Sequence, residues 1–496
     1  MKNYVFPALA SVLVMNSFLA EAQAIRGVPT YDPQGQSPQI QYFKPASDKQ
    51  FVGDCIPFYD NGTFYLYWLL DEGHHSCLNG LGAHQWCLST SKDLTNWKHY
   101  PIAIGIDEDW EKSICTGSVV KKGKTFYAFY ATRRILEDGS VNEQLSYAIS
   151  EDGISYTKHK PNPFYTSAPG YDKRNFRDPK VIVDKDGKFH LLVSSLKNDH
   201  LMNDDAGCLV HLTSSDLKSW AVLDPLLSGV KEVPECSDYF FWHGWYYLIY
   251  GQGGDTYYVK SKHPYGPWEY PESQALLEQW VNVAKTAYFN NDRRIVAGWI
   301  PSKDGDKDNG SERFGGNIVL REACQLPNGD LATHFPEEVV PKTEKPINLS
   351  VVSSENAVIN RPDDVVLGDI GNTGCISYNN IPQNCRITMT VTPESVFQEY
   401  GIIMRGDNRA DGYKLVLNNN YQQVSLYQDA TINAVTGLDK TITLDIIIKD
   451  DIIDACIDGR RCIVNRLGEK NGKFLWLYAR QGKVKFENIK IFPLSK

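Results

Sequence analysis

The sequence predicts an all-β protein in which a five-bladed β-propeller is followed by a β-sandwich. Three observations lead to this prediction: a strand motif recurs five times in the first two thirds of the chain, a turn motif follows most copies, and the composition changes after Pro336. The chain has 496 residues, of which 42% are hydrophobic and 22% are charged. These values are typical of a folded protein of two or three domains and exclude a disordered chain.

The N-terminus has the features of a secretory signal peptide. Lys2 precedes a mostly apolar run over residues 5–20, and the small residues Ala22 and Ala24 stand at the spacing that signal cleavage requires. We therefore expect residues 1–24 to be removed and the protein to be exported, to the periplasm or the extracellular space. The apolar run is too short for a membrane-spanning helix of about 20 residues, and no later segment reaches that length without charges.

Charge and aromatic content narrow the expected partners. The net charge of -9 would repel phosphate backbones, so we expect no nucleic-acid partner. The aromatic content of 12% suits both β-strands and stacking on sugar rings, which makes a carbohydrate the expected ligand. We expect no cofactor, and the sequence carries no signal of an oligomeric state.

Five segments share one pattern, a turn followed by a strongly aromatic or β-branched strand, and their starts are 49 to 63 residues apart. Three are followed by a Ser-x-Asp turn that ends in an aromatic residue, and no convincing amphipathic helix lies between them. Radially repeated four-stranded sheets fit this pattern, so we expect a five-bladed propeller over residues 25–336. An irregular β-sandwich is the alternative. The five segments begin at Gly62, Lys124, Gly187, Gly244 and Arg293, and the three turns at Ser91, Ser150 and Ser214.

The character of the chain changes after Pro336. The stretch over residues 337–346 is polar and contains prolines, which is typical of a linker. Of the 11 tryptophans, only Trp476 lies beyond this stretch. The alternating apolar stretches that follow are separated by Asp, Asn and Gly turns. They predict an antiparallel β-sandwich over residues 346–496. These stretches are Ile387–Val391, Gly412–Leu417, Thr441–Ile448 and Lys483–Phe492.

The repeat places three acidic residues at equivalent positions. In a propeller the first strand of each blade lines the central channel, and Asp54, Asp178 and Glu235 precede their repeat starts by eight, nine and nine residues. The corresponding stretch of the second repeat, Cys115–Ser118, is uncharged and offers hydrogen-bonding groups such as Thr116. A single surface acid is usually only solvated, but three acids in register near one axis favour a functional site.

Paired carboxylates that flank one bond are what glycoside cleavage needs, one to donate a proton and the other to attack or to activate water. We expect Glu235 to be the acid, because Pro234 and Cys236 give it a less polar setting. Asp54, beside Gly53, is the expected nucleophile. Asp178 follows an arginine that should keep it ionised, which suits it to stabilise an oxocarbenium-like transition state.

These residues resemble glycoside hydrolase family 32, the family of invertases, inulinases and levanases. The resemblance covers nearly the whole mature chain. Its strongest motifs are Phe176-Arg-Asp-Pro179, which is similar to the Arg-Asp-Pro motif of the family, and Pro234-Glu-Cys236, which is similar to its Glu-Cys motif. Further similar stretches are Cys115–Ser118, Trp86–Trp97, Gly298-Trp299 and Phe314–Gly316.

The resemblance implies a five-bladed propeller plus β-sandwich and retaining hydrolysis of β-fructofuranosides such as sucrose or fructans. Carried over by motif, Asp54 would be the nucleophile, Glu235 the acid/base and Asp178 the transition-state stabiliser. Substrate-binding roles are expected for residues of the similar motifs and of the loop over residues 72–87. These residues are Arg177, Trp86, His84, His75, Thr116 and Trp299.

One motif departs from the family pattern. The family's Trp-Met-Asn-Asp-Pro-Asn-Gly nucleophile motif appears as Phe51-Val-Gly-Asp-Cys-Ile-Pro57, and Leu69 replaces the Gln that usually ends the next strand. The departure leaves open a divergent subgroup that acts on another furanoside or fructan linkage, and a non-catalytic carbohydrate-binding protein that has kept the fold. An inverting propeller glycosidase on arabinosyl or xylosyl units also uses three acids and is a further alternative.

The histidine- and cysteine-bearing stretch over residues 72–87 raises the question of a metal. Its potential ligands match no familiar zinc spacing, so we expect no metal. We expect the loop to rim the channel mouth, with His75 or His84 bonding sugar hydroxyls and Trp86 stacking on a ring. A hydrogen-bonded loop histidine and a packed tryptophan are the alternative.

The chain has 11 cysteines, which an exported protein could use in disulfides. The best pair is Cys456 with Cys462, which would face each other across a short hairpin loop. Cys77 with Cys87 and Cys375 with Cys385 are weaker pairs, and small buried thiols are the alternative.

Overall fold

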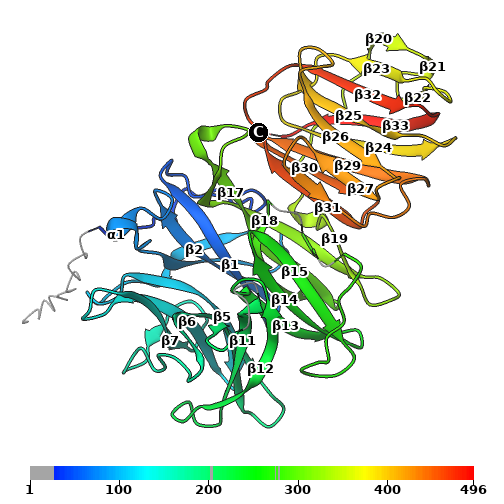
Figure 1. Ribbon diagram of the computed structural model, residues 1–496. Coiled ribbons are helices and arrows are strands. Elements are labelled where there is room, and N and C mark those ends of the chain that lie inside the picture. The colour runs from blue at the N-terminus through cyan, green and yellow to red at the C-terminus, as the bar shows by residue number, and fades with distance from the viewer. Residues whose placement is uncertain (1–26, 201–204, 274, 278–279, 496) are drawn as a thin grey trace, which may run out of the picture.

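The computed structural model describes residues 27–200, 205–273, 275–277 and 280–495. The expected leader, residues 1–24, lies outside the described residues. The described chain is built almost entirely of antiparallel strands (Figure 1). Its few helical turns are the short α1 (Cys77–Gly80) and two 3-10 turns, Asp304–Asp306 and Glu337–Val339.

The N-terminal part of the chain forms four sheets. The largest sheet joins the beginning and the end of this part in the order β16-β17-β18-β1-β2-β3-β4, with β19 beside β18. The link is the antiparallel pairing of β1 with β18, in which Val52 lies opposite Gly316. Its strands are β1 (Gln50–Asp60), β2 (Thr63–Glu72), β3 (Gln85–Ser91), β4 (Lys98–Ile104), β16 (Asn282–Phe289), β17 (Arg293–Lys303), β18 (Glu312–Gln325) and β19 (Leu331–His334).

The other three sheets follow in chain order, and each is a simple meander. The second holds β5 (Ser113–Lys122), β6 (Thr125–Ile135), β7 (Val141–Ser150) and β8 (Thr157–Lys158). The third holds β9 (Tyr171–Val183), β10 (Phe189–Lys197), β11 (Gly207–Ser214) and β12 (Ala221–Val230). The fourth holds β13 (Glu235–Trp242), β14 (Trp245–Gln252) and β15 (Asp255–Ser261).

The repeat that the sequence predicts is confirmed as a hairpin repeat. Each aromatic or β-branched segment is the second strand of a hairpin, namely β2, β6, β10, β14 and β17. The Ser-x-Asp turns also share one geometry, because in each the aspartate accepts hydrogen bonds from the backbone N–H groups two and three residues later. These aspartates are Asp93, Asp152 and Asp216. A side chain that satisfies its own turn explains why the motif recurs.

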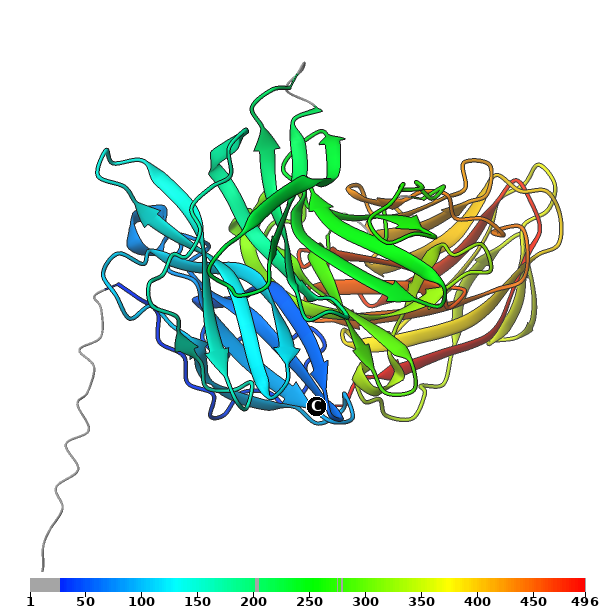
Figure 2. The same ribbon diagram turned by 90° about the horizontal axis from the view of Figure 1, so that it is seen from below.

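The C-terminal part is a sandwich of two seven-stranded sheets (Figures 1 and 2). All four alternating stretches that the sequence singled out coincide with its strands to within one residue, so the predicted sandwich is confirmed. One sheet is β20 (Val351–Glu355), β23 (Gly374–Tyr378), β32 (Phe474–Arg480), β25 (Glu399–Gly406), β26 (Tyr413–Asn418), β27 (Gln423–Leu426) and β28 (Ala430–Ile432). The other is β21 (Ala357–Arg361), β22 (Asp364–Leu367), β33 (Val484–Pro493), β24 (Cys385–Pro393), β29 (Ile442–Lys449), β30 (Ile452–Ile457) and β31 (Arg461–Arg466).

Buried polar contacts connect the sandwich to the N-terminal part of the chain. The guanidinium of Arg321 on β18 lies 2.7 Å from Asp454 on β30, and both side chains are fully buried. Tyr42 donates a second hydrogen bond, of 2.7 Å, to the same carboxylate. One apolar cluster, which includes Val319 and Ile463, continues across the junction. Separation of the two parts would expose this shared apolar cluster to water, so the cluster joins them, and the buried polar contacts fix how they meet.

The expected disulfides are wrong. All eleven cysteines lie in the described part of the chain and all carry free thiols. Cys456 and Cys462 do face each other across the β30–β31 hairpin, so their predicted positions hold although no bond joins them. Cys77 instead directs its thiol at the carbonyl of Glu72, and Cys87 is buried in a core cluster. Cys375 and Cys385 belong to different sheets of the sandwich.

Candidate active site

The first strand of each hairpin carries an irregularity at the same place. The register of the pairing between the first and second strands shifts next to the predicted acids in β1, β9 and β13. It shifts at the equivalent positions of β5 and β16 as well. Such bulges turn side chains out of the regular alternation and are frequent beside active sites. The shifts lie between Val52 and Cys55, Ile114 and Gly117, Leu192 and Ser194 on the partner of β9, Glu235 and Asp238, and Asn282 and Lys285.

Three bulge residues also have positive φ angles, which only glycine adopts without cost. They are Asp178 with φ 54°, Cys236 with φ 53° and Val283 with φ 39°. For a β-branched residue such as Val283 this conformation is strongly disfavoured. Backbone strain of this kind collects at sites that must hold a particular geometry.

The bulges surround one cavity of about 430 Å³. All three predicted acids line it, as do five of the six residues predicted to bind substrate: Arg177, His84, His75, Thr116 and Trp299. Residues from β1, β5, β9, β13 and β16 therefore meet at one place, as the repeat count predicts. Leu69, the departure from the family pattern, also lines the cavity.

Trp86 is the exception, and its predicted stacking role is wrong. Its side chain is fully buried in an apolar cluster with Tyr67 and Tyr130. Its indole N–H donates to the carbonyl of Cys115 at 2.8 Å. A ring without exposed surface cannot stack on a sugar, so Trp86 instead supports β5 beneath the cavity.

Asp54 is held at both carboxylate oxygens. The indole of Trp299 donates to Oδ1 at 3.2 Å, and the thiol of Cys236 lies 3.6 Å from Oδ2. The neighbouring Gly53 makes this packing possible, because a Cβ at that position would lie 2.9 Å from the ring of Phe314. Asp54 is thus a half-buried carboxylate in a fixed orientation, which is what attack on a bound sugar requires.

Asp178 lies deeper and differs electrostatically from the sequence-based expectation. It is 5% exposed, and the backbone N–H of Cys236 donates to it at 3.1 Å. Burial raises the pKa of Asp178 to about 7, with Glu235 among the acids that add to the effect. The Arg177 guanidinium, 3.8 Å away, opposes this rise but does not cancel it. Arg177 therefore does not keep Asp178 fully ionised: the carboxyl is about half ionised at neutral pH and mostly protonated at lower pH.

Glu235 has a more polar setting than its sequence neighbours indicate. Its side chain is 41% exposed, and Arg177 Nη2 donates to Oε1 at 2.9 Å. The thiol of Cys236 points away from it, toward Asp54 and Asp178. The apolar surroundings that we expected for Glu235 are thus replaced by an ion pair at the mouth of the cavity.

A charged network that the sequence analysis missed lies beside Arg177. Glu143 on β7 lies 3.6 Å from Arg177 Nε and accepts a bond of 2.7 Å from Arg133 on β6. Arg133 also donates to His75 Nε2 at 2.8 Å. Arg133 and Glu143 lie opposite each other on β6 and β7, the second and third strands of their sheet, whereas the repeat count concerns only first strands and so gives no sign of them.

The same count could have found Lys285, which stands eight residues before the fifth repeat start, Arg293. Its ammonium is buried and donates to Thr116 Oγ1 at 2.7 Å and to the carbonyl of Gly117 at 3.0 Å. Lys285 thereby fixes Thr116 at the cavity wall. The first, third and fourth repeats carry acids at the equivalent positions, so a search for acids passes over a lysine in the fifth repeat.

The two predicted loop histidines are held by partners from this chain. The buried Asp71 bonds His84 Nε2 at 3.1 Å and accepts the backbone N–H of His75 at 2.8 Å. Burial lowers the pKa of His75 to about 4, so its Nε2 is a neutral acceptor for Arg133. Among the described residues, no group of three or more His, Cys, Asp or Glu side chains is placed to hold a metal.

The buried Asp178 predicts an unusual pH dependence of stability. Its folded pKa of about 7 lies above the ordinary 3.8, so ionisation costs more in the folded state. The group therefore lowers the free energy of unfolding as pH rises from about 4 to about 7. Replacing Asp178 with Asn should remove this decline and stabilise the protein at pH 8, by about 4 kcal/mol at most.

Urea unfolding of both proteins between pH 4 and pH 8 measures this difference. The exposed Asp186→Asn, in the turn that follows β9, is the matched control and should leave the decline unchanged. An Asp178→Asn protein that is less stable than the parent at pH 8 would contradict the electrostatic description.

The N-terminal part of the chain matches the model of a known family. Residues 49–322 match the model of the glycosyl hydrolases family 32 N-terminal domain. That match covers more than half of the chain, so the protein belongs to glycosyl hydrolase family 32.

Curated relatives match over a shorter stretch. The sucrose-6-phosphate hydrolase of Bacillus subtilis is 29% identical over 183 residues, which are 35% of this chain and 36% of that protein. The extracellular exo-inulinase of Aspergillus niger is 26% identical over 211 residues, which are 36% of this chain and 37% of that protein. The chain thus spans little more than a third of the length of these two relatives.

Solved structures match over almost the full length. Fructan 1-exohydrolase IIa from Cichorium intybus has a TM-score of 0.69 at 16% identity, covering 93% of this chain and 98% of that one. The β-fructofuranosidase of Bombyx mori has a TM-score of 0.65 at 17% identity, covering 93% and 95%. At such identities the likeness concerns the fold, and it supports a β-propeller joined to a β-sandwich. No helix in the described ranges is both long enough and apolar enough to cross a membrane.

Proposed function

We propose that this protein is an exported hydrolase that cleaves β-fructofuranosidic linkages with retention of configuration. The observation that carries the proposal is the meeting of Asp54, Asp178 and Glu235 in one cavity, each from the bulge of a different first strand. Membership of glycosyl hydrolase family 32 supports the choice of a fructoside, either sucrose or a fructan.

The proposed reaction has two displacements at the anomeric carbon of the fructosyl unit. Asp54 attacks this carbon while Glu235 gives its proton to the leaving oxygen, which departs as an alcohol. Glu235 then takes a proton from water, and the resulting hydroxide displaces Asp54. Asp54 suits the first role because both its oxygens are oriented. Glu235 suits the second because it stands at the open mouth, within reach of water and of a leaving group.

Asp178 has a supporting role in this proposal. Its buried carboxylate can bind fructosyl hydroxyls, and in the ionised form it stabilises positive charge on the sugar in the transition state. Arg177 touches both Glu235 and Asp178, so it couples the protonation of the two acids.

The architecture that we propose has five blades. In it, the eight-stranded sheet comprises the first and fifth blades, joined where β1 pairs with β18, and the other three sheets are the second, third and fourth blades. We place the propeller at residues 25–336 and the sandwich at 346–496, after a signal peptide of residues 1–24. Secretion of the full chain, followed by N-terminal sequencing of the product, tests the leader and the export.

A substrate panel tests the proposed function. We expect the purified protein to release fructose from sucrose, inulin or levan, and to leave arabinofuranosides and xylosides intact. Release of arabinose or xylose instead would favour the inverting alternative. Binding of saccharides without any turnover would favour the non-catalytic one.

A further inference from the structure

A second cavity, of about 500 Å³, lies in the C-terminal sandwich and shares no lining residue with the cavity of the three acids. It opens on the face of β32 that is turned away from the inter-sheet core. On this strand Leu475, Leu477 and Ala479 belong to the core, whereas Trp476 and Tyr478 form a separate cluster on the other face. The cavity therefore belongs to the outer surface of one sheet.

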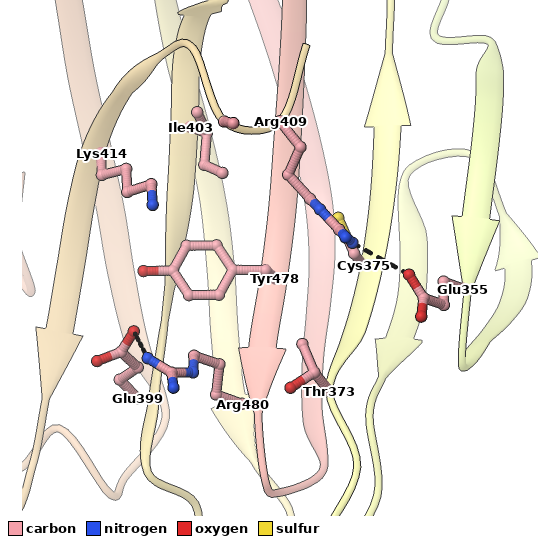
Figure 3. Close-up of a pocket in the computed structure, with 10 residues that line it drawn as sticks. Glu355, Thr373, Cys375, Glu399, Ile403, Arg409, Lys414, Tyr478 and Arg480 are labelled. Carbon is pink, nitrogen blue, oxygen red and sulfur yellow. Dashed lines mark hydrogen bonds and ion pairs between the residues drawn. The ribbon is translucent and has the colours of Figure 1, made fainter.

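An aromatic ring forms the floor of this cavity. Tyr478 lies directly opposite Gly401 on β25. A Cβ at Gly401 would lie 2.9 Å from the Tyr478 hydroxyl and 3.1 Å from its ring, so the glycine lets the ring lie flat against the neighbouring strand. Figure 3 shows this ring face-on at the centre of the cavity, with charged side chains around it. Because Tyr478 is almost entirely buried, its ring closes the floor of the cavity, and contacts with a ligand are left to the polar groups at the edge of the ring.

The Tyr478 hydroxyl is a buried group without a hydrogen-bond partner in the described chain. The residue is only 7% exposed, and burial raises the pKa of its phenol, so the hydroxyl keeps its proton. A buried donor without a partner costs free energy, which a ligand that accepts its hydrogen bond would recover. The unsatisfied group thus points to a polar ligand in this cavity.

Four of the five charged side chains that line the cavity are paired with each other, and the exposed Lys414 is the fifth. Arg480 lies 3.1 Å from Glu399, and Arg409 lies 3.0 Å from Glu355 (Figure 3). An anionic ligand would meet two carboxylates as well as these three cations. Each pair instead presents donors and acceptors side by side, which is the arrangement that sugar hydroxyls need, because every hydroxyl both donates and accepts.

We propose that this cavity is a binding site for a neutral saccharide, distinct from the site of the three acids. The hydroxyls of the sugar bond the Arg409–Glu355 and Arg480–Glu399 pairs, and one of them accepts the hydrogen bond of the Tyr478 hydroxyl. On the same chain as a glycosidase, such a site would keep a polymeric substrate near the catalytic cavity. The proposal concerns binding alone and does not depend on turnover.

Affinity electrophoresis of the full chain tests this proposal, with soluble inulin, levan, dextran or xylan in the gel. The Asp54→Asn background prevents consumption of the polysaccharide. We expect retardation by at least one of the four polymers. Arg409→Ala should raise the apparent Kd for that polymer about tenfold, and Tyr478→Phe, which keeps the ring, several-fold.

The matched control is Arg361→Ala on β21. Arg361 is also an exposed arginine paired with a carboxylate, Asp363 at 3.1 Å, but it does not line the cavity. This change should leave the apparent Kd within about twofold. Retardation that Arg409→Ala and Tyr478→Phe leave unchanged would overturn the proposal, as would no retardation by any polymer. Displacement of the polymer by millimolar inorganic phosphate would identify an anion site instead and would also overturn it.

Discussion

Replacing Asp54 with Asn should lower kcat on the fructoside that we expect the protein to hydrolyse by roughly 10⁴-fold or more, because an amide cannot form the covalent intermediate. The fold should be retained, since an asparagine can still accept the indole hydrogen bond of Trp299. Substrate binding should change little, so KM should stay within about tenfold of the parent value. Steady-state kinetics with sucrose and inulin measure both constants.

The control for this variant is Asp48→Asn, an exposed aspartate just before β1, which should have parental kinetics. Thermal unfolding of the Asp54→Asn protein shows whether the fold is intact. A folded Asp54→Asn protein with parental activity would remove Asp54 from the mechanism.

Replacing Glu235 with Gln should lower kcat by roughly 10²- to 10⁴-fold for substrates whose leaving oxygen needs a proton. The loss should be much smaller for a fructosyl donor with a good leaving group, such as a nitrophenyl fructoside, because departure of nitrophenolate needs no acid. Added azide should restore part of the rate with that donor and yield fructosyl azide, since azide needs no general base. Neither effect is expected from a residue with a merely structural role.

Glu232→Gln is the matched control for this variant. Glu232 is an exposed glutamate three residues earlier and does not line the cavity. An equal loss of rate for good and poor leaving groups in Glu235→Gln would contradict proton donation by this residue.

Much of the fold follows from local sequence signals. The aromatic segments and the Ser-x-Asp turns predict the hairpins correctly, because strand propensity and turn hydrogen bonds are properties of a few neighbouring residues. The alternating stretches of the sandwich are equally local. The pairing of β1 with β18 is not, since it joins residues more than 250 positions apart in the sequence.

The site was predictable where residues recur in register and unpredictable where contacts cross between strands. Counting from the repeat starts brings Asp54, Asp178 and Glu235 together correctly. The same count says nothing of how deep each side chain lies, and burial is what raises the pKa of Asp178 in spite of Arg177.

Two further differences between the sequence-based predictions and the structure have the same origin. Trp86 was expected in the cavity because tryptophan often stacks on sugars, but a large apolar ring is equally suited to a core. The Arg133–Glu143 pair was overlooked because its partners, His75 and Arg177, lie on other sheets or loops. Burial and cross-strand partners are set by the assembled fold.

The most direct test of the central claim is the configuration of the product formed in the presence of methanol, followed by NMR. Methanol can replace water in the second displacement and gives a methyl fructofuranoside, whose anomeric centre does not mutarotate. A double displacement through Asp54 with Glu235 as acid/base predicts methyl β-fructofuranoside. Formation of methyl α-fructofuranoside would contradict it.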